Sequence, residues 1–411
     1  MIVLSGASLV LPDRILSPGT LIIDGDRIAE IRPDAPSAGA AHSHFAFHGH
    51  WIVPGFIDVH VHGVDGVDAL DGGSPVAAIA ERLPRYGVTA FCPTTVACPP
   101  EALRFVLDQV RRARQTPPAL AARVLPAHLE SNFVNAEYAG AQPIVCLRTP
   151  AELERRAGGQ FGAADVLAEI ERATPDVGIV TLAPELAGAS GLIRTLTERG
   201  HRVSLGHSAA TYDETIEAIA AGARQATHLF NRMPPVHHRA PGLAGAVLNT
   251  EEVAAEIICD GVHVHPAVVR MAIAAKTPSR MLAITDGTSV AGCPIGSRGR
   301  LGGREITAGP SGAQLADGTL AGSTVTMDGA FRMLVQAGIS LPEAAILCST
   351  TAARELGLVG HGLLAADAVA DLVVLDSDLA VVQTYVAGRL AYSRATTAPL
   401  RPPPGAPDIS S

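Results

Sequence analysis

Short apolar runs alternate with amphipathic stretches along most of the chain. GVTAFCPTT, ARVLPAHLE and HRVSLGHS have the pattern of buried strands, whereas PEALRFVLDQVRRARQ and TYDETIEAIAAG carry apolar residues at helical spacing. Repeated units of this kind predict parallel strands joined by helical crossovers. The chain carries about eight such units, and no GxGxxG motif follows the first strand, which disfavours an open dinucleotide-binding sheet. We therefore expect an α/β fold built on a (β/α)8 TIM-like barrel.

Both ends of the chain have a different pattern, that of half-buried strands. Residues 2–10 and 20–32 alternate apolar and polar positions, and residues 369–391 are again rich in strand formers. We expect the two ends to meet in one small β-sandwich domain beside the barrel, followed by a disordered tail. The expected division is residues 1–50 with 360–395 for the β-domain, 51–359 for the barrel and 396–411 for the tail.

Composition narrows the classes of function. Hydrophobic residues make up 47% of the chain, so a large core can be buried, and the formal net charge is −9 with no basic block. This charge argues against nucleic-acid binding. No apolar run approaches the roughly 18 residues of a membrane span, and the start lacks the features of a signal peptide. The six cysteines form no CxxC pair. We expect a reduced, cytoplasmic protein without a thiolate zinc cluster.

Ionisable residues stand where the predicted strands end. WIVPGFIDVHVHG has the pattern of one apolar strand that ends in histidines, and its HxH spacing puts His60 and His62 on the same face. The active sites of barrels lie at the carboxyl ends of their strands. One histidine at a strand end is usually structural, but so many charged groups at one rim are hard to explain by packing. The other strand-end residues are Glu130, His207, His228 and Asp286.

Imidazole and carboxylate groups together suit zinc and related divalent metals. We therefore predict a metal-dependent hydrolase with one or two ions per chain, Zn2+ first, with Fe2+, Mn2+ and Co2+ as alternatives. The only lysine, Lys276, ends a helical stretch, so a carboxylated lysine cannot bridge two metals and Glu130 is the expected bridge. Asp286 is the best candidate for the general base, with a metal ligand or a helix cap as alternatives. His128 is interpreted as a supporting or structural residue.

Several longer motifs point to one family. GFIDVHVHG, LAPE, GHS, THLFNRMPPVHHRAPGLAGA, CDGVHVHP, TDG and LAGSTVTM, in this order, closely resemble the N-acetylglucosamine-6-phosphate deacetylases of the amidohydrolase superfamily, from about residue 50 to 355. The long stretch that begins THLFN is specific, whereas HxH is shared by the whole superfamily. The resemblance implies hydrolysis of the linear acetamide of an amino-sugar phosphate, on a homodimeric barrel flanked by a β-domain.

The resemblance also implies a role for each matching residue. Glu130, His207 and His228 match the metal ligands, and His60 and His62 match the pair that holds a second metal. Asp286 matches the catalytic acid and base. His263 matches a residue that contacts the substrate and polarises the acetyl carbonyl. Positions that match substrate-binding residues are Ala141, Gln142, Asn231, Arg232, Arg239, Ala321, Gly322 and Ser323, of which Arg239 binds the sugar phosphate.

Arg239 lies in a local basic cluster with His237 and His238. A guanidinium fork suits a phosphate, and a solvated surface patch is the alternative interpretation.

Two departures from the family pattern leave the sugar open. The chain has HLESNF where the family has HLEGP, and GAQ, with Gln142, where it has GAH. Both changes fall where the sugar is expected, so N-acetylgalactosamine 6-phosphate or an unphosphorylated N-acyl sugar are alternative substrates. A cyclic-amide hydrolase, such as a dihydroorotase or hydantoinase, is disfavoured by the missing strand-end lysine. A binding protein without catalysis is disfavoured by the full set of ligands beside Asp286.

Overall fold

The computed structural model describes residues 1–33, 43–153 and 160–394. Eight parallel strands form a barrel, in the order β6-β9-β11-β12-β13-β14-β15-β16. The barrel closes where Val61 bridges Gly287 in parallel and the N–H of Asp286 donates to the carbonyl of His60 at 3.0 Å. The predicted (β/α)8 barrel is confirmed. Its strands are β6 Phe56–Val61, β9 Val88–Thr95, β11 Ala127–Glu130, β12 Val177–Leu182, β13 Arg202–Leu205, β14 Gln225–Ala226, β15 Ala254–Ile258 and β16 Met281–Ile284. The short strand β10 Arg123–Val124 pairs with β9 just before β11 does.

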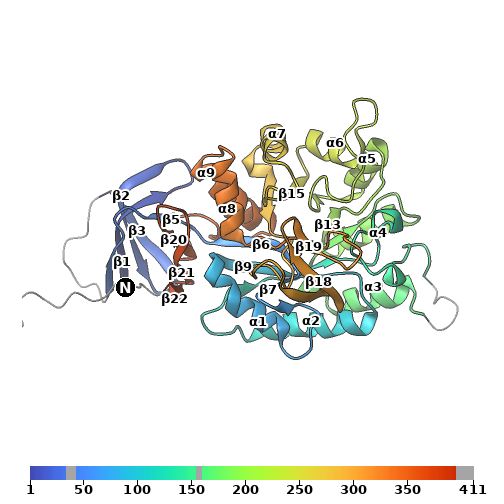
Figure 1. Ribbon diagram of the computed structural model, residues 1–411, viewed down its shortest axis with the longest axis horizontal. Coiled ribbons are helices and arrows are strands. Elements are labelled where there is room, and N and C mark those ends of the chain that lie inside the picture. Colours follow the sequence, from blue (N-terminus) through green and yellow to red (C-terminus); the bar gives the residue numbers. More distant parts are fainter. Residues whose placement is uncertain (34–42, 154–159, 395–411) are drawn as a thin grey trace, which may run out of the picture.

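Helices surround the barrel (Figure 1). In α2, Leu103, Val106, Leu107 and Val110 are buried at the three- and four-residue spacing that aligns one face of a helix. None of the helices in the described part of the chain is long and apolar enough to cross a membrane. The helices are α1 Pro75–Arg82, α2 Pro100–Gln115, α3 Ala163–Arg172, α4 Ala189–Glu198, α5 Tyr212–Ala221, α6 Gly242–Asn249, α7 Pro266–Lys276, α8 Met327–Gln336, α9 Leu341–Ala345 and α10 Thr351–Glu355.

Strands from both ends of the chain share one eight-stranded sheet beside the barrel, at the left of Figure 1. It has its own core, in which Leu9, Leu21, Ile52, Leu372 and Tyr385 are buried. This confirms that both ends meet in one small β-domain. The exact domain limits stay a prediction, and the expected tail lies outside the described residues. The strands are β1 Ile2–Val10, β2 Ile15–Asp24, β3 Arg27–Arg32, β4 Ser43–Ala46, β5 Trp51–Pro54, β20 Leu372–Leu375, β21 Val381–Val386 and β22 Arg389–Ser393.

The first apolar run is two strands, not the single strand that the sequence suggested. β5 pairs with β1 and β20 in the small sheet, and β6 begins two residues later inside the barrel. The break falls at Gly55, where an added Cβ would collide with the side chain of Thr89. Pro54, which has no N–H to donate, precedes the break. The histidines therefore end a short barrel strand whose position is set by this turn.

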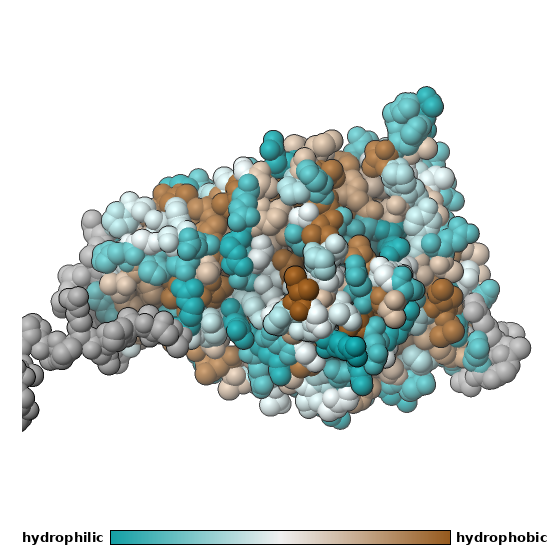
Figure 2. Space-filling view, in the orientation of Figure 1, coloured by the Kyte–Doolittle hydropathy of each residue, from teal (hydrophilic) through white to brown (hydrophobic). Residues whose placement is uncertain are grey.

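A small antiparallel sheet follows the last barrel strand and was not predicted. It consists of β17 Arg298–Leu301, β18 Arg304–Gly309 and β19 Gly312–Gln314, and it packs on Leu315 and Val290. A short hairpin, β7 Gly63–Val64 with β8 Val67–Asp68, lies beside it. On the face seen in Figure 2, exposed apolar side chains are dispersed among polar ones, as is usual for single surface residues.

Candidate active site

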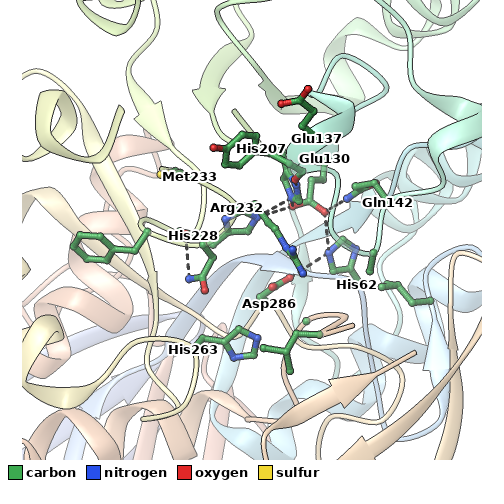
Figure 3. Close-up of a pocket in the computed structure, with 17 residues that line it drawn as sticks. His62, Glu130, Glu137, Gln142, His207, His228, Arg232, Met233, His263 and Asp286 are labelled. Carbon is green, nitrogen blue, oxygen red and sulfur yellow. Dashed lines mark hydrogen bonds and ion pairs between the residues drawn. The ribbon is translucent and has the colours of Figure 1, made fainter. Parts of the chain in front are cut away.

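The strand-end residues converge on a cavity of about 480 Å³ at the carboxyl end of the barrel (Figure 3). This volume lies in the usual range for pockets that hold a small molecule. His60 lies directly beneath, fully buried. Eleven of the residues predicted from the sequence line the cavity, namely His62, Glu130, Ala141, Gln142, His207, His228, Asn231, Arg232, His263, Asp286 and Gly322.

Glu130, His207 and His228 form the tightest group. Oε1 of Glu130 lies 2.8 Å from Nε2 of His207 and 2.9 Å from Nε2 of His228, and the two ring nitrogens are 3.0 Å apart. Burial alone would raise the pKa of Glu130, but His207, His228 and His60 hold it well below its ordinary value. The carboxylate is therefore ionised, and three potential ligand atoms point at one place.

The tautomers of this group test whether a metal fits. Nδ1 of His207 lies 2.8 Å from the carbonyl oxygen of Tyr138, which can only accept a hydrogen bond, so this nitrogen carries the proton. In the neutral ring the lone pair is then on Nε2, which faces the carboxylate. Nδ1 of His228 is buried and has no hydrogen-bond partner among the residues that the structure describes. Lone pairs that converge in a buried site need a cation between them, so the donor set fits a divalent metal.

A second group consists of His60, His62 and Asp286, whose facing atoms are all 3.3 Å apart. Nδ1 of His60 donates to the buried carboxylate of Glu256 at 2.9 Å, so its Nε2 faces the group. Burial lowers the pKa of His60, but Asp286 and Glu256 raise it to about 10. The negative charge of Asp286 in this group can therefore be balanced by the imidazolium of His60 as well as by a metal.

Glu130 is the residue that joins the two groups. Its Oε1 lies 3.7 Å from Nε2 of His60, and its Oε2 lies 3.5 Å from Nε2 of His62. The carboxylate therefore faces both groups, with Oε1 beside His207, His228 and His60 and Oε2 beside His62. Its role as a bridge between two metals stays a prediction. Lys276 is remote from both groups of candidate ligands. It is the last residue of α7, and its ammonium donates to the carbonyl of Thr250.

The backbone bends sharply where three of these side chains emerge. His207, His228 and Asp286 each lie two residues beyond the last residue of their strand, and their φ angles are 48°, 30° and 48°. Left-handed φ is uncommon for residues with a Cβ and costs roughly 1–3 kcal/mol at each position. The same turn repeated at three strand ends directs these side chains into the cavity, and the surrounding packing sustains the strain.

His263 lies on the wall opposite the first group and is held by a carboxylate. Its Nδ1 donates to Oδ2 of Asp260 at 2.6 Å, and Oδ1 of Asp260 accepts from the backbone N–H of His263. Burial lowers the pKa of His263, but Asp260 raises it overall. The ring is thus oriented and able to donate through Nε2 into the cavity.

His128 and Glu256 lie below the cavity. Nδ1 of His128 donates to the carbonyl of Val59 at 2.9 Å and its Nε2 accepts from Thr181 at 2.7 Å, so no lone pair is left for a metal. Burial lowers the pKa of His128 to about 4. This fits the supporting role inferred from the sequence. Glu256 was missed, although an isolated glutamate inside the apolar run EVAAEIICDG is itself a signal of a buried polar network.

The residues that depart from the family pattern do not all reach the cavity. Ser131 donates to the carbonyl of Thr181 at 2.6 Å, and Nδ2 of Asn132 donates to the carbonyls of Cys98 and Cys146 at 2.9 and 2.8 Å. Both side chains are buried and build the loop that follows β11. We expected these changes to lie where the sugar sits, but the structure shows that Ser131 and Asn132 are used inside this loop.

The other predicted substrate residues fall into two sets. Gly322 lines the cavity, whereas Ser323 is buried behind it and donates to the carbonyl of Thr285 at 2.5 Å; Ala321 is also buried. Arg239 is exposed, contacts His238 at 2.8 Å and does not line the cavity. Lining residues that the sequence did not single out are Glu137, Tyr138, Phe230, Met233, Leu301 and Leu320.

Known proteins resemble the chain over most of its length. The model of the amidohydrolase family matches residues 51–391. A Homo sapiens protein named N-acetylglucosamine-6-phosphate deacetylase is 37% identical over 409 residues, 95% of this chain and 94% of the human protein. An Escherichia coli O157:H7 protein named N-acetylgalactosamine-6-phosphate deacetylase is 37% identical over 344 residues, 83% and 87% of the two chains.

A solved structure resembles the fold as well. A mutant N-acetyl-D-glucosamine-6-phosphate deacetylase from Mycobacterium smegmatis, in complex with N-acetyl-D-glucosamine-6-phosphate, superposes with a TM-score of 0.83 at 33% identity. The match covers 95% of this chain and 99% of that one. The similarity therefore includes the barrel, the β-domain and the residues around the cavity.

Proposed function

Because the chain belongs to the amidohydrolase family, we propose that it is a metal-dependent deacetylase that hydrolyses N-acetylglucosamine 6-phosphate to glucosamine 6-phosphate and acetate. The observation that carries this proposal is the convergence of Glu130, His207 and His228 beside Asp286 in one cavity. One glutamate, two histidines and one aspartate at the strand ends of a barrel suit hydrolysis of an amide by an activated water.

Glu130, His207 and His228 are the residues that would hold the metal, which would polarise the acetamide carbonyl and lower the pKa of a bound water. Asp286 takes a proton from the attacking water and passes it to the departing nitrogen, so that amide and water become acetate and amine. Burial would raise the pKa of Asp286, but His60 and the hydrogen bond from His62 hold it below its ordinary value. Asp286 is therefore ionised and able to accept this proton.

His263 stabilises the charge that develops on the acetyl oxygen. Its Nδ1 donates to Asp260 at 2.6 Å. Burial lowers the pKa of His263 but Asp260 raises it overall, which favours the imidazolium, and in that form Nε2 also carries a proton to donate into the cavity. A donor fixed before the reaction begins costs no reorganisation in the transition state. Asn231 and Arg232 line the same cavity and are the proposed sugar-binding residues. Arg239, which is exposed, is the proposed phosphate-binding residue.

A second candidate substrate is N-acetylgalactosamine 6-phosphate. The relative named for that sugar is as similar to this chain, at 37% identity, as the human protein is. An unphosphorylated N-acyl sugar is the third candidate, because Arg239 is exposed and outside the cavity of the single chain.

We also propose the identity of the metal ion, the oligomeric state, the location in the cell and the domain limits. Zn2+ is the proposed ion, because two imidazoles and one carboxylate are common ligands of catalytic zinc. The proposed active form is a homodimer, the state that the resemblance to the deacetylase family implies. A cytoplasmic location is proposed because all six cysteines are free. The proposed domains are residues 1–50 with 360–395 and residues 51–359.

The test is acetate release from the three sugars by the purified protein. N-Acetylglucosamine 6-phosphate is expected to have the highest kcat/KM, and a chelator is expected to abolish the reaction until Zn2+ is restored. If N-acetylgalactosamine 6-phosphate is hydrolysed with the higher kcat/KM, the second candidate replaces the first. If no sugar releases acetate with metal present, the proposed function is wrong.

A further inference from the structure

The amide of Gln142 is buried against the metal-ligand set, and both of its functional atoms are bonded. Its Oε1 accepts from the backbone N–H of Ala97 at 2.7 Å, and its Nε2 donates to Oε2 of Glu130. A backbone N–H can only donate, so the oxygen must face Ala97 and the NH2 group must face Glu130. With 3% of its surface exposed, the side chain has little freedom to turn toward a ligand in the cavity.

The loop that carries Gln142 reaches the ligand set at a second point. The carbonyl of Tyr138 accepts from Nδ1 of His207 at 2.8 Å. The base of this loop is held by Asn132, whose amide donates to the carbonyls of Cys98 and Cys146. One loop therefore fixes a carboxylate oxygen and a ring nitrogen of the same three-residue group.

We propose that Gln142 is a positioning residue for Glu130 and not a contact for the sugar. Glu130 presents Oε1 to His207 and His228, and the Gln142 amide holds the other oxygen so that the carboxylate cannot rotate away. A hydrogen bond from an anchored donor also favours the ionised carboxylate, the form that binds a metal. This inference rests on the proposed metal-dependent function, which it extends to the residues around the ligands.

The positions that depart from the family pattern are connected through one loop and its contact with Glu130. Ser131 and Asn132 shape the start of the loop, and Gln142 is its contact with Glu130. Changes that looked like a new sugar site in the sequence are, in the structure, parts of one support for the metal ligands. The identity of the sugar is then decided by other lining residues.

The test compares metal affinity in three variants. Gln142→Met keeps the length of the side chain and removes both hydrogen bonds, and Gln142→His retains one donor and one acceptor. Met233→Leu is the matched control, since Met233 lines the same cavity and is 7% exposed. Each metal-free protein is titrated with Zn2+ against a fluorescent chelator, and KM and kcat are then measured at saturating Zn2+. Thermal unfolding of the metal-free proteins checks that each variant is folded.

The expected result is a Zn2+ affinity about 10–100-fold weaker in Gln142→Met, the usual effect of removing a partner of a metal ligand. Gln142→His is expected to recover most of this loss, and Met233→Leu to bind like the wild type. KM at saturating Zn2+ is expected to change by no more than about twofold in Gln142→Met, because no sugar contact is lost.

An unchanged Zn2+ affinity in Gln142→Met overturns the proposal, whatever happens to KM. A large rise in KM with unchanged affinity would assign Gln142 to the sugar instead. If the wild-type protein binds no divalent metal, the proposed function fails first, so the two failures are distinguishable.

Discussion

Replacement of Glu256 by glutamine should weaken the support beneath the cavity without changing its shape. The two carboxylate oxygens accept from Nδ1 of His60 at 2.9 Å, Nε2 of Gln225 at 2.5 Å and the backbone N–H of His228 at 3.3 Å. A glutamine offers one oxygen and one NH2 group, so the NH2 group must oppose a donor. Gln225 cannot relieve this by flipping, because its own Oε1 already accepts from Arg202 at 2.6 Å.

Glu256→Gln leaves one buried donor without an acceptor, which should lower the free energy of unfolding by about 1–3 kcal/mol. The unfolding entropy of 411 residues is roughly 0.9 kcal/mol/K, so the midpoint of thermal unfolding should fall by about 1–3 °C. Since Glu256 also fixes the orientation of His60, metal binding at the group formed by His60, His62 and Asp286 should weaken about 10–100-fold.

The assay is calorimetric unfolding of the metal-free protein together with a Zn2+ titration that counts ions per chain. Glu252→Gln is the matched control, because Glu252 is exposed near the start of the same strand. Its unfolding midpoint and metal binding should equal those of the wild type. If Glu256→Gln unfolds and binds metal like this control, Glu256 does not hold His60 and the reasoning is refuted.

Three further outcomes are expected. Gly322→Ala should unfold at a lower temperature than Gly318→Ala and should lose activity. Both glycines have positive φ, but only at Gly322 would the new Cβ lie 2.8 Å from the carbonyl oxygen of Asp286. Equal unfolding midpoints in the two variants would contradict this. Burial lowers the pKa of His60 but its carboxylate partners raise it from 6.5 to about 10. The stability that this imidazolium adds is therefore complete below pH 6.5 and is lost as the pH rises toward 10. The unfolding midpoint of the metal-free protein should fall over this pH range, and the midpoint of the Zn2+-loaded protein should fall less. Arg239→Ala should raise KM for N-acetylglucosamine 6-phosphate about 10–100-fold and leave hydrolysis of N-acetylglucosamine unchanged, whereas an equal effect on both sugars would remove Arg239 from the phosphate.

The barrel and the group of strand-end residues could be predicted because both depend on local pattern. Alternating strands and helices fix the architecture, and the carboxyl ends of parallel strands meet at one rim whatever the loops do. Glu130, His207, His228 and Asp286 all ended apolar runs in the sequence, and the structure brings them together at one cavity.

The parts that escaped prediction depend on contacts between distant segments. The break at Gly55 is set by the close approach of Thr89 on a neighbouring strand, which no local pattern reveals. The role of Asn132 was misjudged for the same reason, because its partners are carbonyls of Cys98 and Cys146 that only the folded loop brings within reach. Glu256 is a further example. Its place inside an apolar run indicates a buried charge, but the sequence does not show which groups form hydrogen bonds with it.

The variant Asp286→Asn tests whether Asp286 moves the proton in a metal-dependent deacetylation. Acetate release from N-acetylglucosamine 6-phosphate is measured for the wild type and the variant, both loaded with Zn2+ and with metal content confirmed. We expect steady turnover by the wild type and a kcat lower by about 10²–10⁴-fold in the variant, with equal metal content and a similar KM. Turnover by Asp286→Asn at the wild-type rate would contradict it.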